Sequence, residues 1–126
     1  MIYEGPERRR SIRVKTTLTV KYAQDALDEN TRKWDTTIVR DISEHGICIT
    51  TTGSFLPKEA LTLLIKFPSK PLEQIEIKGS VVDSKSLKAS FGQTVRDTYV
   101  TRIEFTDLKE EHRELIRSYV QLLSHK

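Results

Sequence analysis

Apolar and polar side chains alternate along the first clearly patterned stretch of the chain. Charged residues and threonines separate six positions suited to a buried face, which recur at every second residue: Ile12, Val14, Thr16, Leu18, Val20 and Tyr22. A period of two places successive side chains on opposite sides of an extended chain. The pattern therefore predicts a strand over residues 12–22 with one buried and one solvent-facing side.

Five further segments are short and rich in β-branched and other apolar residues, which is typical of strands. The first begins near Trp34 and runs toward Ile42, and the others cover Ile47–Thr50, Leu61–Phe67, Ile75–Val81 and Tyr99–Phe105. The polar hexapeptide Asp41–Gly46 lies between the first two of these segments and predicts a tight turn.

Polar segments separate the remaining strands. Ala23–Lys33 predicts a polar connection, Gly53–Lys58 a loop, and Ser84–Gly92 a hairpin turn or a longer loop. Pro68 and Pro71 cannot donate to a sheet ladder, so we expect them to end the strand before them.

The end of the chain has a helical pattern. Its apolar stripe recurs at steps of three and four residues and consists of Leu108, His112, Leu115, Ile116, Tyr119, Val120 and Leu123. Asp107 and Glu110 have the spacing of an N-terminal capping arrangement. We therefore expect a helix over residues 107–123.

The order of these elements predicts a mainly β domain. Six short strands followed by one amphipathic helix fit an antiparallel six-stranded barrel formed by residues 14–105, with the C-terminal helix over an opening or one face. An open α+β sandwich would produce the same order of elements. Periodicity does not choose between the two architectures.

Length and composition fit a single domain over residues 1–126. The chain is 37% hydrophobic and 31% charged, which supports a folded protein rather than a disordered one. Its apolar runs are far shorter than the roughly 18 residues of a membrane span, and its first residues lack the pattern of a secretory signal. Cys48 is the single cysteine, so it forms no internal disulfide and no cysteine-based metal site. We expect a cytoplasmic protein.

The candidates for catalysis are poor. His45 falls in the predicted turn, His112 on the apolar stripe and His125 near the C-terminus, and none has a companion at metal-ligand spacing. We interpret His112 as a partly buried residue of the core or its rim, and Cys48 as a small buried hydrophobe. The sequence therefore predicts neither an enzyme nor a metal site.

Charge is unevenly distributed. Residues 1–22 hold six basic and two acidic side chains, whereas the other 104 residues hold 15 basic and 16 acidic ones. The whole positive excess therefore belongs to the N-terminal segment. This localisation favours a discrete anion site over a surface that binds nucleic acid along its length.

Four arginines carry most of that excess: Arg8, Arg9, Arg10 and Arg13. Their like charges repel one another unless an anion lies among them. Each guanidinium offers a planar donor fork suited to phosphate oxygens or to the O6/N7 edge of guanine. Taken alone, a run of this kind is more often a solvated tail.

The predicted turn carries complementary chemistry. Asp41 can accept hydrogen bonds from the N1–H and N2–H₂ edge of guanine, Ser43 can bind a phosphate or a backbone group, and Gly46 permits a positive φ and a close approach. Taken alone, the hexapeptide fits an ordinary hairpin turn equally well.

Together the two elements resemble the motifs of the PilZ domain family, whose members are bacterial receptors for the second messenger cyclic di-GMP. Arg9 and Arg13 match an RxxxR motif just before the first strand, and a D-x-S-x-x-G motif about thirty residues later is matched by Asp41, Ser43 and Gly46. Each motif is short, but their order, separation and strand context agree.

The resemblance extends over nearly the whole chain. Gly79–Val82 is similar to the later G-x-V strand of the family, and Arg102–Phe105 is similar to its G-I-x-F strand before the terminal helix. Arg102 departs from the pattern, because many family members have glycine at this position.

The resemblance implies that cyclic di-GMP binds on the outer surface of a six-stranded barrel. Arg9 and Arg13 would contact phosphate and guanine, Asp41 and Ser43 would read a guanine and its surroundings, and Gly46 would shape the turn. No other cofactor is implied.

The resemblance also implies a way of signalling. Arg8 is at a position that can stack on guanine and is associated with a mutually intercalated pair of ligands, so we expect two ligands per chain. Residues 1–13 would be a flexible segment that orders on binding and so alters a protein partner.

Two other functions remain open. A small barrel can bind RNA or single-stranded DNA, but such modules stack bases on aromatic residues within a basic groove, and here only Tyr3 and Tyr22 lie near the arginines. The other is a PilZ-like adaptor that binds no ligand and acts through protein contacts. Such an adaptor would not need intact binding motifs, so the intact motifs of this chain argue against it.

Overall fold

The computed structural model describes residues 12–25, 33–91 and 94–124. Within these ranges the chain forms seven strands and one helix: β1 (Val14–Lys15), β2 (Thr19–Gln24), β3 (Asp35–Ile42), β4 (Gly46–Thr51), β5 (Ala60–Ile65), β6 (Ile75–Phe91), β7 (Thr94–Thr106) and α2 (Glu110–Ser124). The central part of the predicted polar connection, residues 26–32, lies outside the described residues.

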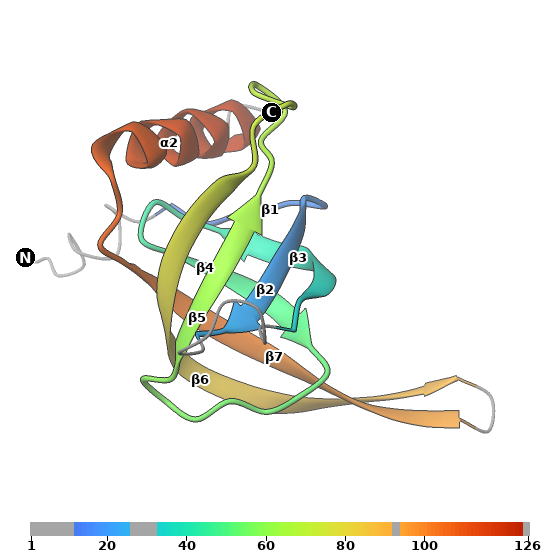
Figure 1. Ribbon diagram of the computed structural model, residues 1–126. Helices are drawn as coiled ribbons and strands as arrows, with labels where there is room; N and C mark the ends of the chain where they lie inside the picture. Colours follow the sequence, from blue (N-terminus) through green and yellow to red (C-terminus); the bar gives the residue numbers. More distant parts are fainter. Residues whose placement is uncertain (1–11, 26–32, 92–93, 125–126) are drawn as a thin grey trace, which may run out of the picture.

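Six of the strands close into an antiparallel barrel (Figure 1). Neighbours follow the order β3-β2-β5-β6-β7-β4, and an additional pairing of β3 with β4 completes the ring. β1 is an extra strand, paired with the end of β3. The predicted six-stranded barrel with a C-terminal helix is confirmed, and the open sandwich is excluded by the pairing of β3 with β4.

The first strand is broken where a continuous one was predicted. The hydroxyl of Thr16 accepts a hydrogen bond from the amide of Leu18 at 3.1 Å, a local bond that competes with the sheet ladder. Val14 and Val20, on either side of the break, are buried as the alternation requires. Ile12 is 55% exposed, contrary to the prediction, because pairing with β3 begins only at Val14.

A bulge in β3 changes which of its residues face the core. Its register to β4 shifts between Val39 and Asp41, so Val39 and Ile42 are both fully buried although they are three positions apart. One extra residue in a strand reverses the alternation beyond it. Ile38 therefore lies on the outer side and is 56% exposed.

The hairpin of β6 and β7 is much longer than predicted. The two strands pair from Lys78 with Thr106 as far as Phe91 with Thr94. The expected loop over Ser84–Gly92 is therefore wrong, because all but its last residue belong to β6. The far half of this hairpin projects from the barrel on the side away from α2 (Figure 1).

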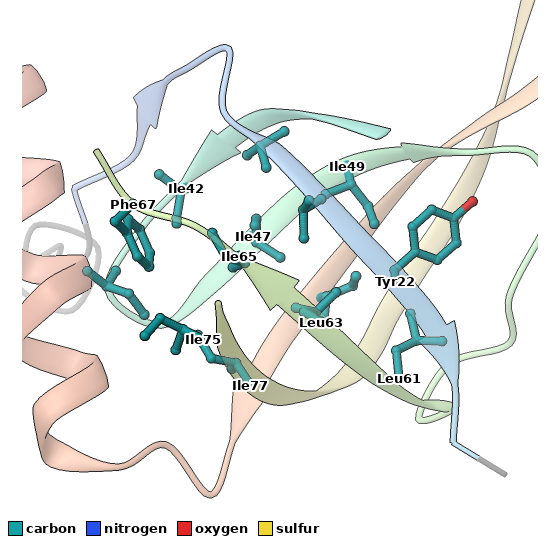
Figure 2. Packing of buried hydrophobic residues seen from close by; sticks show 14 of the residues in the cluster. Tyr22, Ile42, Ile47, Ile49, Leu61, Leu63, Ile65, Phe67, Ile75 and Ile77 are labelled. Carbon is teal, nitrogen blue, oxygen red and sulfur yellow. The ribbon is translucent and has the colours of Figure 1, made fainter. Parts of the chain in front are cut away.

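The barrel interior is filled by aliphatic side chains from the strands, together with Phe67 and Tyr22. In Figure 2, Phe67 and Ile75 lie toward α2, whereas Tyr22 and Leu61 lie toward the other end of the barrel. Each of these four side chains is at most 6% exposed. The core therefore runs the length of the barrel.

Helix α2 covers one end of the barrel (Figure 1). Ile116 and Val120 are its buried residues, and the ring of Tyr119 packs against that of Phe67 with centroids 5.5 Å apart. The predicted apolar stripe is thus the packed face. The helix begins at Glu110, and Asp107 has a φ of 49°, so the predicted capping role of Asp107 is wrong.

Candidate functional site

The turn between β3 and β4 is held by Ser43. Its amide donates to the carbonyl of Gly46 at 2.9 Å, and its hydroxyl accepts from the amides of His45 at 3.3 Å and Gly46 at 3.2 Å. Ser43 is buried. Of the two kinds of partner expected for this hydroxyl, the structure shows the backbone, in a local motif that favours turns.

Gly46 is required by a close approach of strands. A Cβ built on it would lie 2.5 Å from the carbonyl oxygen of Ile103 and 3.5 Å from Nη2 of Arg13. Its φ lies outside the left-handed region, so the expected positive φ is wrong and the expected close approach is confirmed. The missing side chain lets β7 and Arg13 lie against the turn.

Arg13 and Asp41 form an ion pair at the mouth of the turn. β1 positions Arg13, because Val14 pairs with Ile42 and Lys15 pairs with Asp41. Nη1 of Arg13 donates to Oδ1 of Asp41, and the two side chains are 42% and 30% exposed. Since a carboxylate has about four lone-pair sites, Asp41 can accept further hydrogen bonds while it remains paired.

A pocket of about 160 Å³ opens beside this ion pair. Three predicted site residues line it, namely Arg13, Ser43 and Gly46. The rest of its wall consists of His45, Val82, Arg102, Ile103 and Glu104. The first motif, the turn and the parts of β6 and β7 that lie within the barrel therefore meet at one surface.

Arg102 was missed as a site residue by the sequence reasoning. Its Nε and Nη2 donate to the two carboxylate oxygens of Asp83 at 3.0 and 2.5 Å. Hydrogen bonding to Arg102 lowers the pKa of Asp83, and the same bond raises the pKa of Arg102. The sequence did contain a signal for this residue, because Arg102 places a planar cation where many family members have glycine.

Glu44 was also missed, and it connects the turn to α2. Its Oε2 accepts a hydrogen bond from Nη2 of Arg117 at 2.9 Å and lies 4.0 Å from Nη1 of Arg113. The bond from Arg117 is the main cause that lowers the pKa of Glu44. A usable signal was the spacing of Arg113 and Arg117, which places two cations on one helix face.

Cys48 lies on β4 between two of these residues. It pairs with Asp41 on β3 and with Arg102 on β7. The thiol is buried, as predicted, and burial raises its pKa. A raised pKa keeps the sulfur protonated, so Cys48 acts here as packing beneath the charged residues.

A larger hollow of about 590 Å³ lies elsewhere, between the start of β6 and the start of α2. His112 lines it from a half-buried position, in agreement with its interpretation as a rim residue. None of the predicted binding residues lines this hollow, so it is separate from the candidate site.

The predicted contacts of Arg8 and Arg9 lie outside the described residues. Within the described ranges, no group of three or more His, Cys, Asp or Glu side chains could hold a metal ion. α2 does not have the length and apolar character needed to cross a membrane.

Several solved structures share the fold. The PilZ domain of YcgR from Escherichia coli, solved with c-di-GMP, has a TM-score of 0.66 and 13% identity over 94% of this chain and 92% of that chain. MrkH of K. pneumonia in its apo state has a TM-score of 0.68 and 13% identity, over 90% of this chain and 50% of that chain. The PilZ domain of CeSA from a cellulose-synthesizing bacterium has a TM-score of 0.58 and 13% identity, over 91% of this chain and 100% of that chain.

At these identities the structural likeness shows the fold alone. The chain spans about half the length of MrkH. No protein of curated function matches the sequence significantly. The sequence model of the PilZ domain, however, matches residues 7–122, which is nearly the whole chain. The chain therefore belongs to the PilZ domain family.

Proposed function

We propose that the protein is a receptor for cyclic di-GMP, which binds between the arginine segment and the Asp41–Gly46 turn. The observation that carries the proposal is the exposed ion pair of Arg13 and Asp41. A pocket opens beside this pair, and Arg13, Ser43 and Gly46 line it. Family membership and the PilZ domain of YcgR, solved with c-di-GMP, support the choice of ligand.

The chemistry of the site suits the two parts of this ligand. Arg13, together with Arg9 of the same motif, provides charge-assisted donors for phosphate oxygens and for the O6/N7 edge of guanine. Asp41 provides the acceptor for the N1–H and N2–H₂ edge. Ser43 and Gly46 hold the turn in the shape that presents Asp41.

The signal passes from this site to a protein partner. Residues 1–13 fold over the turn when the ligand arrives, and their new surface is what the partner recognises. Glu44 lies within the same turn and bonds Arg117, so a change in the turn also acts on α2. The protein performs no catalysis in this scheme and acts in the cytoplasm.

Two arginine variants test the site. We expect Arg9→Ala and Arg13→Ala each to weaken binding of cyclic di-GMP by about 1.5 to 3 kcal/mol in calorimetric titrations, because each loses a charge-assisted donor fork. Arg96→Ala is the matched control, since it removes an arginine from the far half of the β6–β7 hairpin. If both site variants bind as the parent does, the site is wrong.

The number of bound ligands tests the role of Arg8. An intercalated pair brings four phosphate charges to a segment with four arginines, and the Arg8 guanidinium stacks on an exposed guanine face, a contact worth about 0.5 to 2 kcal/mol. We expect the parent to bind two ligands per chain and Arg8→Ala to bind one. A parent that saturates at one ligand would contradict this role.

A further inference from the structure

We propose that Arg102 is an additional ligand-binding residue, whose guanidinium contacts a guanine of the bound dinucleotide in an orientation set by Asp83. The inference rests on the proposed function and deepens it. It assigns a binding role to a residue at which this chain departs from the glycine of many family members.

Sheet pairing places Arg102 in one row with the candidate site. Asp41 on β3 is opposite Cys48 on β4, Cys48 is opposite Arg102 on β7, and Arg102 is opposite Asp83 on β6. Directly opposed residues on antiparallel strands point to the same face of a sheet. Arg102 also lines the same pocket as Arg13. Arg102 belongs to β7, whereas Arg13 is the residue before β1.

Asp83 fixes the plane of the Arg102 side chain. The carboxylate accepts from Nε and Nη2 and so uses one edge of the guanidinium. The Nη1 donors and the planar face remain for a ligand, since the side chain is 52% exposed. A cation held in one plane loses less conformational entropy on binding.

The same ion pair favours a base over a phosphate. The carboxylate of Asp83 cancels much of the positive charge of Arg102, which weakens its attraction for an anion. Stacking on an aromatic face and donation to O6 and N7 use the planar shape of the guanidinium and keep their value in an ion pair.

The pocket itself fits one base better than a whole dinucleotide. Its volume of about 160 Å³ is below the roughly 300 Å³ at which pockets begin to enclose a drug-sized ligand. The bulge between Val81 and Asp83 leaves Val82 45% exposed, and Val82 lines the pocket together with Ile103. These apolar side chains supply the surface on which a flat base packs.

Calorimetry on the full chain with cyclic di-GMP tests this assignment. We expect Arg102→Gln to weaken binding about tenfold, in line with a cation–π contact. Arg102→Lys should be weakened to a similar degree, because lysine keeps the charge but lacks the planar face. Asp83→Asn should lose about threefold, since it releases the plane of the guanidinium. Lys21→Gln, which removes one exposed charge from β2, is the control and should bind as the parent does.

Each contrary result has a distinct meaning. A parent that does not bind cyclic di-GMP overturns the proposed function and this inference with it. A parent that binds while Arg102→Gln binds equally well overturns only the role of Arg102. Full affinity in Arg102→Lys would show that a phosphate is the partner, and the assignment to guanine would be wrong. Thermal unfolding of each variant confirms that the barrel is intact.

Discussion

The residues at the β3–β4 turn have different structural roles. Ser43 closes the turn through backbone bonds, whereas Gly46 admits β7 at a distance that no other residue allows. Arg13 and Asp41 are left exposed on the same surface. The parts of the motif that shape the site are therefore buried, and the parts that offer charge are open to a ligand.

Replacing Gly46 tests the close approach. We expect Gly46→Ala to lower the free energy of unfolding by about 1 to 3 kcal/mol, the usual cost of overpacking, because its methyl group would lie 2.5 Å from a backbone oxygen. Gly53→Ala is the matched control, since a Cβ there meets no atom within 4 Å. Urea denaturation of both variants measures the difference, and equal stabilities would contradict the packing role.

The spacing of the two motifs was enough to predict that four site residues lie close together, because they flank two adjacent strands. These residues are Arg13, Asp41, Ser43 and Gly46. Arg102 joins them only through the pairing of β7 with β4, which sequence separation does not reveal. The φ of Gly46 was predicted incorrectly for a related reason. The sequence shows that a glycine is present, whereas the need for it comes from a distant strand.

Among the elements, α2 has a specific connection to the turn. Glu44 bonds Arg117, and its side chain is 23% exposed, so the pair is partly shielded from solvent. The hydroxyl of Thr16, just beyond β1, also bonds that of Tyr119 on the helix. A helix held to both motif-bearing segments is suited to respond when either of them moves.

The pH dependence of stability tests the bond between Glu44 and α2. Because the pKa of Glu44 is lowered in the folded state, its stabilising effect is complete above the unfolded-state pKa of about 4.3 and is lost as the pH falls through the folded value. We expect Glu44→Gln to lose about 1 kcal/mol of unfolding free energy at pH 7 and nothing in strong acid. Urea titrations at a series of pH values measure both limits.

Glu114→Gln provides the control for this comparison. Glu114 bonds the same Arg117, at 2.7 Å, but lies within α2 and is 56% exposed. Its loss should cost less than half as much, because an exposed pair within one helix is worth only a few tenths of a kcal/mol. An equal cost for the two variants, or a Glu44 effect that persists in acid, would show that the bond to the turn has no special role.

The β6–β7 hairpin shows where pattern reasoning fails at the scale of elements. Ser84–Phe91 is rich in serine and lysine, so its composition is typical of a loop, and apolar residues recur at every second position only at Leu87, Ala89 and Phe91. The two strands pair with each other along this whole segment, and cross-strand pairs stabilise such a ribbon. An alternation of only three apolar residues is too short to distinguish such a ribbon from a loop in the sequence.

At the scale of the whole molecule, the strand count and the terminal helix predicted the architecture correctly. Closure of the barrel could not be predicted from periodicity, because it depends on β3 pairing with β2 along one half and with β4 along the other. The bulge near Asp41 lies where this change of partner occurs. The candidate site is thus at the seam that closes the barrel.

The fold determines where the charged segment of the chain lies relative to the turn. The positive excess of the chain belongs to residues 1–22, and β1 brings the end of the arginine run to the turn. Arg102 lines the same pocket from a distant part of the chain, but its ion pair with Asp83 offsets its charge. The charge available for an anion therefore comes from the N-terminal arginines, whereas Arg102 contributes a planar surface.

Isothermal titration of the full chain with cyclic di-GMP measures whether the protein is a receptor for this ligand, with GMP and the linear dinucleotide as controls. We predict saturable binding of the cyclic ligand with a Kd in the micromolar range or tighter, about −8 kcal/mol or more favourable, and much weaker binding of both controls. If the chain is folded by circular dichroism but does not bind cyclic di-GMP, or binds all three ligands equally, it is not a cyclic di-GMP receptor.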